Sequence, residues 1–169
     1  AAHRCALPPL SGVERLLTHA LAVAVTAIIG LFIALAVFNA PAADDFCFAA
    51  KANQLGFWGA QAFWYEHWAG RYTLNATWTA LMRAGDPFQV YPYPPMLLLA
   101  GTWLSFSFLT AKIAQGQLPF FYSALTGGIV TVLFIAGVPD PAQTFYWVGG
   151  SFTYQLPNML LVVLLGLLL

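Results

Sequence analysis

The chain has 169 residues, of which 60% are hydrophobic and only 7% are charged, and its formal net charge is zero. Soluble globular domains carry about 25% charged residues, so this composition excludes a soluble protein and indicates an integral membrane protein. A net charge of zero gives no indication of a basic surface that could bind the phosphates of nucleic acid, so nucleic acid is not an expected partner. The two cysteines, Cys5 and Cys47, predict neither a disulfide framework nor a metal-binding pair.

The first predicted element is a short polar head, residues 1–15, followed by a transmembrane span over residues 16–38. The span is uncharged and long enough to cross a bilayer. Arg4 and Arg15 precede it, which favours a cytoplasmic N-terminus. A small-x-small pattern at residues 40–42 is also typical of a signal-peptide cleavage site, but the apolar core is longer than such peptides use. We therefore favour an uncleaved anchor.

The next predicted element is an outer loop over residues 39–92. Half of the charged residues of the chain lie between positions 39 and 83, and ionisable groups in a membrane protein tend to mark functional sites. Within this loop we predict one helix over residues 57–84, because Gly56 and Gly85 bound a stretch without proline.

The two faces of this predicted helix differ in side-chain size when residues are placed 100° apart. Small residues allow close helix packing, so we predict that the small face packs against other helices. The aromatic and polar face would then lie at the membrane interface or against a ligand. The aromatic and polar face comprises Trp64, His67, Trp68, Arg71, Asn75 and Trp78, and the small face comprises Ala62, Gly70, Thr73, Ala76, Thr77 and Ala80.

The remaining elements are a second span over residues 93–112, a third over 119–138, a second outer loop over 139–156 and the start of a fourth span over 157–169. A span needs about 20 residues, so we expect that the fourth is cut short and that helices of a longer chain complete the fold. The predicted fold class is all-α, a polytopic transmembrane helical bundle with about four spans in residues 1–169. The first outer loop would carry an interfacial helix.

Three short motifs carry a resemblance to a known family. They are ADDF at 43–46, WAGRY at 68–72 and FYWVGGSFTYQLP at 145–157. An acidic pair early in the first outer loop resembles the polytopic glycosyltransferases of the GT-C fold class. The two later strings resemble a bacterial group of uncharacterised membrane proteins placed near that class.

The resemblance implies transfer of a sugar from a polyprenyl-phosphate donor to an acceptor at the outer face of a bacterial inner (plasma) membrane, with inversion. Inversion needs a base for the proton of the acceptor, and a carboxylate can supply it. Asp44 or Asp45 would be this base. Successive residues of an extended loop point to opposite sides, so we expect that only one of the two reaches the acceptor.

The leaving group in such a reaction is a lipid phosphate, which needs a fixed cation. The forked guanidinium of arginine suits this task, so Arg71 is the first candidate and Lys51 the second. Trp and Tyr rings can stack on a sugar or on isoprenoid units. The predicted substrate-binding residues are Arg71, Lys51, His67, Trp68 and Tyr72.

Several alternatives stay open. Mg²⁺ or Mn²⁺ bridging an aspartate and the phosphate would suit carboxylate ligands, but the sequence holds no dedicated ligand cluster. The acidic pair is also typical of a helix cap, Arg71 with His67 of an interfacial pair, and the aromatic residues of an interfacial belt. A non-catalytic membrane assembly or anchoring protein is the alternative function. A transporter is disfavoured because the ionisable residues cluster in loops and not in spans.

Overall fold

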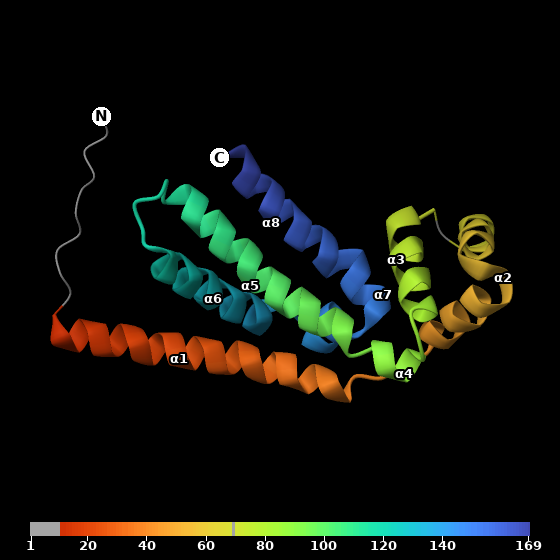
Figure 1. Cartoon of the computed structure of the whole chain (residues 1–169), viewed down its shortest axis with the longest axis horizontal. Coiled ribbons are helices and arrows are strands. Elements are labelled where there is room, and N and C mark those ends of the chain that lie inside the picture. The colour runs from red at the N-terminus through yellow and green to blue at the C-terminus, as the bar shows by residue number, and fades with distance from the viewer. Residues whose placement is uncertain (1–10, 69) are drawn as a thin grey trace. The chain divides into compact units, whose positions relative to one another are not determined.

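A computed structural model describes residues 11–68 and 70–169 of the chain (Figure 1). Most of the predicted head, with Arg4 and Cys5, lies outside the described residues, and so does Ala69 of the WAGRY string. The described residues form helices and no strands, which confirms the all-α class. Four helical segments are long and apolar enough to cross a membrane, as predicted.

The four candidate spans correspond closely to the predicted ones, apart from the last. They are Gly12–Phe38, Pro87–Ile113, Phe120–Gly137 and Val148–Leu168. The first comprises α1 (Gly12–Leu35) and a 3-10 turn (Ala36–Phe38), and the second comprises α4 (Pro87–Val90) and α5 (Tyr93–Ile113). The third is α6 (Phe120–Gly137), and the fourth comprises α7 (Val148–Gly150), a π-helical stretch (Ser151–Gln155) and α8 (Leu156–Leu168).

The second outer loop, predicted over residues 139–156, is largely helical instead. A π-helical stretch covers Ala142–Tyr146, and the helical path that ends at Leu168 begins at Val148 and not at residue 157. The sequence prediction placed the start at Pro157, because proline commonly opens a helix. The π-helical stretch Ser151–Gln155 comes just before Pro157. Its changed hydrogen-bond register accommodates the missing N–H of the proline, so the helix continues through Pro157.

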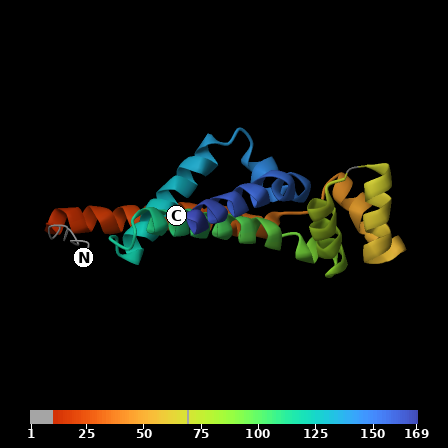
Figure 2. The same ribbon diagram turned by 90° about the horizontal axis from the view of Figure 1, so that it is seen from above.

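The single helix predicted over residues 57–84 is wrong, because two helices occupy this region. They are α2 (Asp44–His67) and α3 (Tyr72–Arg83), which lie side by side (Figure 2). The chain leaves helical geometry at Trp68, with φ −137° and ψ −65°, and glycine in the following stretch disfavours continuing the helix. The predicted start after Gly56 is also wrong, because α2 begins at Asp44 and Gly56 forms a kink inside it, with φ 69°.

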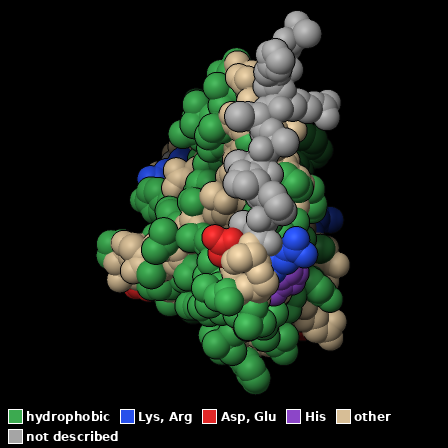
Figure 3. Space-filling model, turned by 90° about the vertical axis from the view of Figure 1, so that its left-hand side faces the viewer, with side chains coloured by type: hydrophobic (Ala, Val, Ile, Leu, Met, Phe, Trp, Pro, Cys, Tyr) green, Lys and Arg blue, Asp and Glu red, His purple; other side chains and the backbone are tan. Residues whose placement is uncertain are grey.

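Two compact units make up the chain, and each is described by itself. The first contains described residues 11–32, 100–137 and 159–169. Small residues let its helices approach closely, and an added Cβ at Gly128 would lie 2.6 Å from Val25. The indole N–H of Trp103 donates to the carbonyl of Ala124 across 2.9 Å. Hydrophobic side chains make up most of the coloured surface seen in Figure 3.

The second unit contains residues 33–99 and 138–158, with Ala69 not described. It holds α2 and α3 together with α4, α7 and the first residues of α5. Both Asp44 and Asp45 lie in this unit, as do all the predicted substrate-binding residues. The candidate site is therefore a property of the second unit.

Candidate functional site

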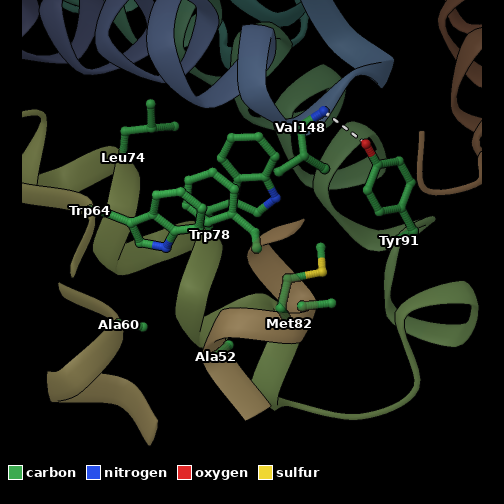
Figure 4. Close-up of a cluster of buried hydrophobic side chains, with 10 residues drawn as sticks. Ala52, Ala60, Trp64, Leu74, Trp78, Met82, Tyr91 and Val148 are labelled. Atoms are coloured by element: carbon green, nitrogen blue, oxygen red, sulfur yellow. Dashed lines mark hydrogen bonds between the residues drawn. The ribbon is translucent and has the colours of Figure 1, made fainter. Parts of the chain in front are cut away.

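The core of the second unit is a stack of three aromatic rings. Phe48 of α2 lies between Trp64, at 4.1 Å between ring centroids, and Trp78 of α3, at 3.7 Å. Both indoles are nearly parallel to the phenyl ring, at 17° and 10°. The stack joins α2 to α3 and lies in a buried cluster that also contains Leu74, Met82, Tyr91 and Val148 (Figure 4).

This packing contradicts half of the predicted aromatic and polar face, whereas His67, Trp68 and Arg71 of that face are exposed as predicted. Trp64, Asn75 and Trp78 were predicted to face the membrane interface or a ligand, but all three are buried. Ala62 and Thr73, from the face predicted to pack, are exposed. The reason is the break after His67, which allows α3 to fold back so that the large rings of both helices bury one another. Burial of large aromatic surfaces contributes more than contact between small side chains.

Asp45 lies in the first turn of α2 and is fully buried. One carboxylate oxygen, Oδ2, accepts hydrogen bonds from the Tyr91 hydroxyl and from the backbone N–H of Ala42, the latter at 2.8 Å. The N-cap residue, Ala43, has no side chain that can cap the helix. The carboxylate of Asp45 takes over part of that task by reaching back to Ala42.

The second oxygen of this carboxylate, Oδ1, is buried and has no hydrogen-bond partner among the described residues. The same is true of the indole nitrogen of Trp78. Burial raises the pKa of Asp45, because desolvation disfavours the charged form. The Tyr91 hydroxyl, the Ala42 N–H and the nearby indole of Trp78 lower the pKa in part, and the charge of Asp44 raises it further.

Tyr91 connects several segments of the second unit. Its hydroxyl donates to Asp45 and accepts a hydrogen bond from the backbone N–H of Val148 at 3.2 Å (Figure 4). The side-chain amide of Asn39 donates to the backbone carbonyls of Tyr91, at 3.5 Å, and of Tyr146, at 2.7 Å. The sequence did not indicate Tyr91 or Asn39 as residues that connect distant segments. A tyrosine in a proline-rich stretch gives no signal for contacts with distant residues.

The two acidic residues have different surroundings. Asp44 is exposed at the first position of α2, whereas Asp45 is in the core. The pair was expected to diverge because of an extended backbone, but it lies in a helix. Successive residues of a helix differ in direction by 100°, and this difference is enough to leave Asp44 at the surface. Of the two predicted bases, Asp44 is the one that a substrate can reach without opening the core.

Two of the predicted substrate-binding residues meet at Phe63. The ammonium group of Lys51 lies 4.2 Å from the centroid of the Phe63 ring. The imidazole of His67 stacks on the same ring, with centroids 4.5 Å apart, and its Nδ1 lies 2.9 Å from the Phe63 carbonyl oxygen. A cation over an aromatic face is stabilised by about 0.5–1 kcal/mol at an exposed site. Phe63 thus contacts both Lys51 and His67.

The other three predicted residues lie at the break between α2 and α3. Trp68 is 51% exposed, and its ring meets Phe48 edge-on, with centroids 5.4 Å apart. Tyr72 is exposed and stacks on Tyr65 at 5.1 Å. Arg71 occupies the N-cap position of α3 and is exposed. Trp68 therefore contacts the buried aromatic cluster from its exposed side, through Phe48 and Trp78.

A metal centre would need several ligands close together. In residues 11–68 and 70–169, no group of three or more His, Cys, Asp or Glu side chains is placed to hold a metal ion. The acidic pair offers one exposed carboxylate, because that of Asp45 is buried and already hydrogen-bonded. The described residues therefore do not form a metal cradle, and we derive no step through a metal.

The described residues form an α-helical polytopic membrane protein. It has four candidate spans and, between the first two, the helices α2 and α3. Comparison with known protein families, with curated proteins and with solved structures finds no match for the chain. A function for this protein is therefore proposed from the residues of the second unit.

Proposed function

We propose that this protein is a membrane glycosyltransferase similar to the GT-C class. It would move a sugar from a polyprenyl-phosphate donor to an acceptor at the outer face of a bacterial plasma membrane. The observation that supports the proposal is the division of the acidic pair after the first span. Asp44 is exposed at the start of α2, and Asp45 is anchored beneath it in the core.

In the proposed reaction, the Asp44 carboxylate removes the proton of an acceptor hydroxyl. The acceptor oxygen then forms a bond to the anomeric carbon from the side opposite the phosphate. The bond from that carbon to the phosphate oxygen breaks, and the lipid phosphate leaves with the electron pair. The configuration at the anomeric carbon is therefore inverted. A carboxylate placed within hydrogen-bond reach contributes about 10²–10⁴-fold to such a step.

The basic side chains of the second unit would bind the lipid phosphate. Lys51 and His67 both lie against the Phe63 ring, and Arg71 is exposed at the start of α3. Lysine binds phosphate as a point charge, whereas arginine can form two parallel hydrogen bonds. Trp68 exposes half of its ring next to the core and provides a surface on which a sugar or an isoprenoid unit can stack.

Asp45 would act as a positioning residue and not as the base. Its carboxylate fixes the start of α2 through Ala42 and Tyr91, and the backbone of Asp44 is part of the same helical turn. Loss of the Asp45 carboxylate should therefore disturb both folding and turnover.

The second candidate function is a non-catalytic assembly or anchoring protein. The observation that favours it is the number of large aromatic side chains on the surface of the second unit, which include Trp58, Tyr65, Trp68 and Tyr72. Aromatic residues are enriched at protein interfaces. An assembly protein would have no need of the Asp44 carboxylate.

The test is an assay of sugar transfer from labelled polyprenyl-phosphate donors by membranes that contain the full-length protein. Wild type is compared with Asp44→Asn and Asp45→Asn at matched protein levels. Asp86→Asn is the control, because Asp86 is an exposed aspartate at the start of α4 in the same region of the chain. We expect Asp44→Asn to lower kcat about 100-fold or more with donor binding retained. We expect Asp86→Asn to leave kcat unchanged.

Full activity of Asp44→Asn would remove this residue from the mechanism. Loss of activity in Asp45→Asn alone, with an unchanged melting temperature, would transfer the role of base to Asp45. If the wild type transfers none of the sugars offered, the assembly function becomes the better explanation.

A further inference from the structure

A row of exposed side chains follows the second half of α2. Trp58 is 81% exposed, Ala62 is exposed, and Tyr65 is 55% exposed. The spacing of four and then three residues places them on one face of the helix. Tyr72, at the start of α3, extends the row because its ring stacks on Tyr65. We call Trp58, Ala62, Tyr65 and Tyr72 the aromatic stripe.

The stripe lies on a different face of α2 from the residues that pack into the core. Ala60 and Trp64 of the same helix point into the buried cluster, so the helix has an occupied face and an open face. The open face carries a tryptophan and two tyrosines. Exposure of these rings to water is unfavourable, because burying one such ring away from water contributes about 2–3 kcal/mol.

The chain itself indicates what lies near this face. The segment that contains α2 and α3 is bounded by candidate spans, one ending at Phe38 and the next beginning at Pro87. Both ends of the segment therefore emerge at the same membrane surface. Only residues 39–43 separate the first span from the start of α2, and five residues reach at most about 17 Å. The start of α2 is thus tethered close to the lipid headgroups.

We propose that the aromatic stripe inserts into the headgroup region of the membrane that the spans cross, with the second half of α2 lying along the surface. Trp and Tyr combine an apolar ring with a polar group, and they are enriched at this depth of a bilayer. The inference goes beyond the proposed function and does not depend on it, because an assembly protein could use the same contact.

The charges near the stripe specify the kind of lipid contact. The stripe contains no cation, and two exposed charged residues beside it, Glu66 and Arg71, carry opposite charges. The stripe and these neighbours have no net basic charge, so the net attraction to anionic lipids that drives many peripheral helices to membranes is absent from this face. Insertion should depend on the aromatic rings and should not need anionic headgroups.

The experiment measures depth with spin labels on the whole protein reconstituted in liposomes. Single cysteines are introduced as Trp58→Cys, Ala62→Cys and Asn53→Cys in a Cys5→Ser, Cys47→Ser background. Asn53 is the matched control because it is exposed on the same helix but precedes the kink at Gly56 and does not belong to the stripe. Collision of each label with oxygen, which concentrates in lipid, is compared with collision with a water-soluble nickel chelate.

We expect the ratio of oxygen to nickel collisions to be several-fold higher for labels at positions 58 and 62 than for the label at position 53. The ratio should be the same in phosphatidylcholine alone and in a mixture with phosphatidylglycerol. Ala62→Cys keeps Trp58, so this variant decides the question even where Trp58→Cys fails to fold. Labels at positions 58 and 62 that collide freely with the nickel chelate would overturn the proposal. Protection from both reagents that rises with protein density would also overturn it, and would assign the stripe to a second copy of the chain.

Discussion

The hydroxyl of Tyr91 donates a hydrogen bond to the buried carboxylate of Asp45, 46 residues away in the sequence. The same hydroxyl accepts the N–H of Val148. One side chain therefore connects the start of α2 with α7 and with the segment that leads into α5. The direction of Asp44, which lies in the same helical turn as Asp45, depends on this connection.

Replacing Tyr91 by phenylalanine keeps the buried ring and removes both hydrogen bonds. The Asp45 carboxylate would then keep only the Ala42 N–H, and the Val148 N–H would lose its acceptor. Such losses cost about 2–4 kcal/mol together. Thermal unfolding in detergent should show the loss for Tyr91→Phe. Tyr93→Phe is the control, because Tyr93 is an exposed tyrosine nearby. Equal melting temperatures for the two variants would contradict the role assigned to the Tyr91 hydroxyl.

The raised pKa of Asp45 predicts a dependence of stability on pH. An unfolded aspartate has a pKa of about 3.9, so the folded state binds this proton more tightly than the unfolded state. The contribution of Asp45 to stability is then fully present below about pH 4. It is lost as the pH rises through the higher pKa of the folded state.

The measurement is the melting temperature of wild type and of Asp45→Asn across this range of pH. The difference between the two proteins isolates the contribution of Asp45, and the decline with rising pH should be smaller in the variant. A difference between wild type and Asp45→Asn that is constant with pH would show that Asp45 has the same pKa in both states.

Gly56 has a positive φ of 69° at the kink of α2, where a side chain is strained. The Arg83 guanidinium lies against the kink, donates to the Ala52 carbonyl at 3.1 Å and would lie 3.5 Å from a Cβ at Gly56. Gly56→Ala should therefore cost about 1–3 kcal/mol in unfolding free energy. Gly30→Ala is the control, since an added Cβ there meets nothing within 4 Å. A neutral Gly56→Ala would indicate that α2 continues without a kink.

Gly127 of α6 should be intolerant of any side chain. An added Cβ would overlap the backbone and the side chain of Ser107 on α5, with the Ser107 Cα only 2.6 Å away. Overpacking of this kind costs about 1–3 kcal/mol. We expect Gly127→Ala to lower the melting temperature, whereas Gly137→Ala should not, because its Cβ would have open space. Equal stability of the two variants would argue against close contact of α5 with α6.

The sequence by itself determined the membrane class and most of the span positions. A charge-free run over residues 16–38 has few alternatives to a transmembrane helix, because backbone polar groups in lipid must bond within their own segment. The same argument located the second and third spans. Gly56 was recognised as an interruption of the helical pattern, but it was predicted as a helix boundary and is a kink inside α2.

The start of the fourth span was not predicted correctly from local sequence. Pro157 indicated a helix start, but the helix begins earlier and continues past Pro157 after the π-helical stretch Ser151–Gln155. The break after His67 was likewise invisible. Glycine at position 70 costs a helix only about 1 kcal/mol, so the residues around the break are compatible with one long helix, and contact between α2 and α3 makes the break favourable.

The two aspartates of the candidate site were found from the sequence, but their separate environments were decided by the tertiary structure. Asp45 is buried because Tyr91 and Val148, distant in the chain, close around it. Trp64 and Trp78 became core residues because Phe48 fits between them. A helical pattern shows which side chains share a face, but the face that is buried depends on which distant surface gains most by covering it.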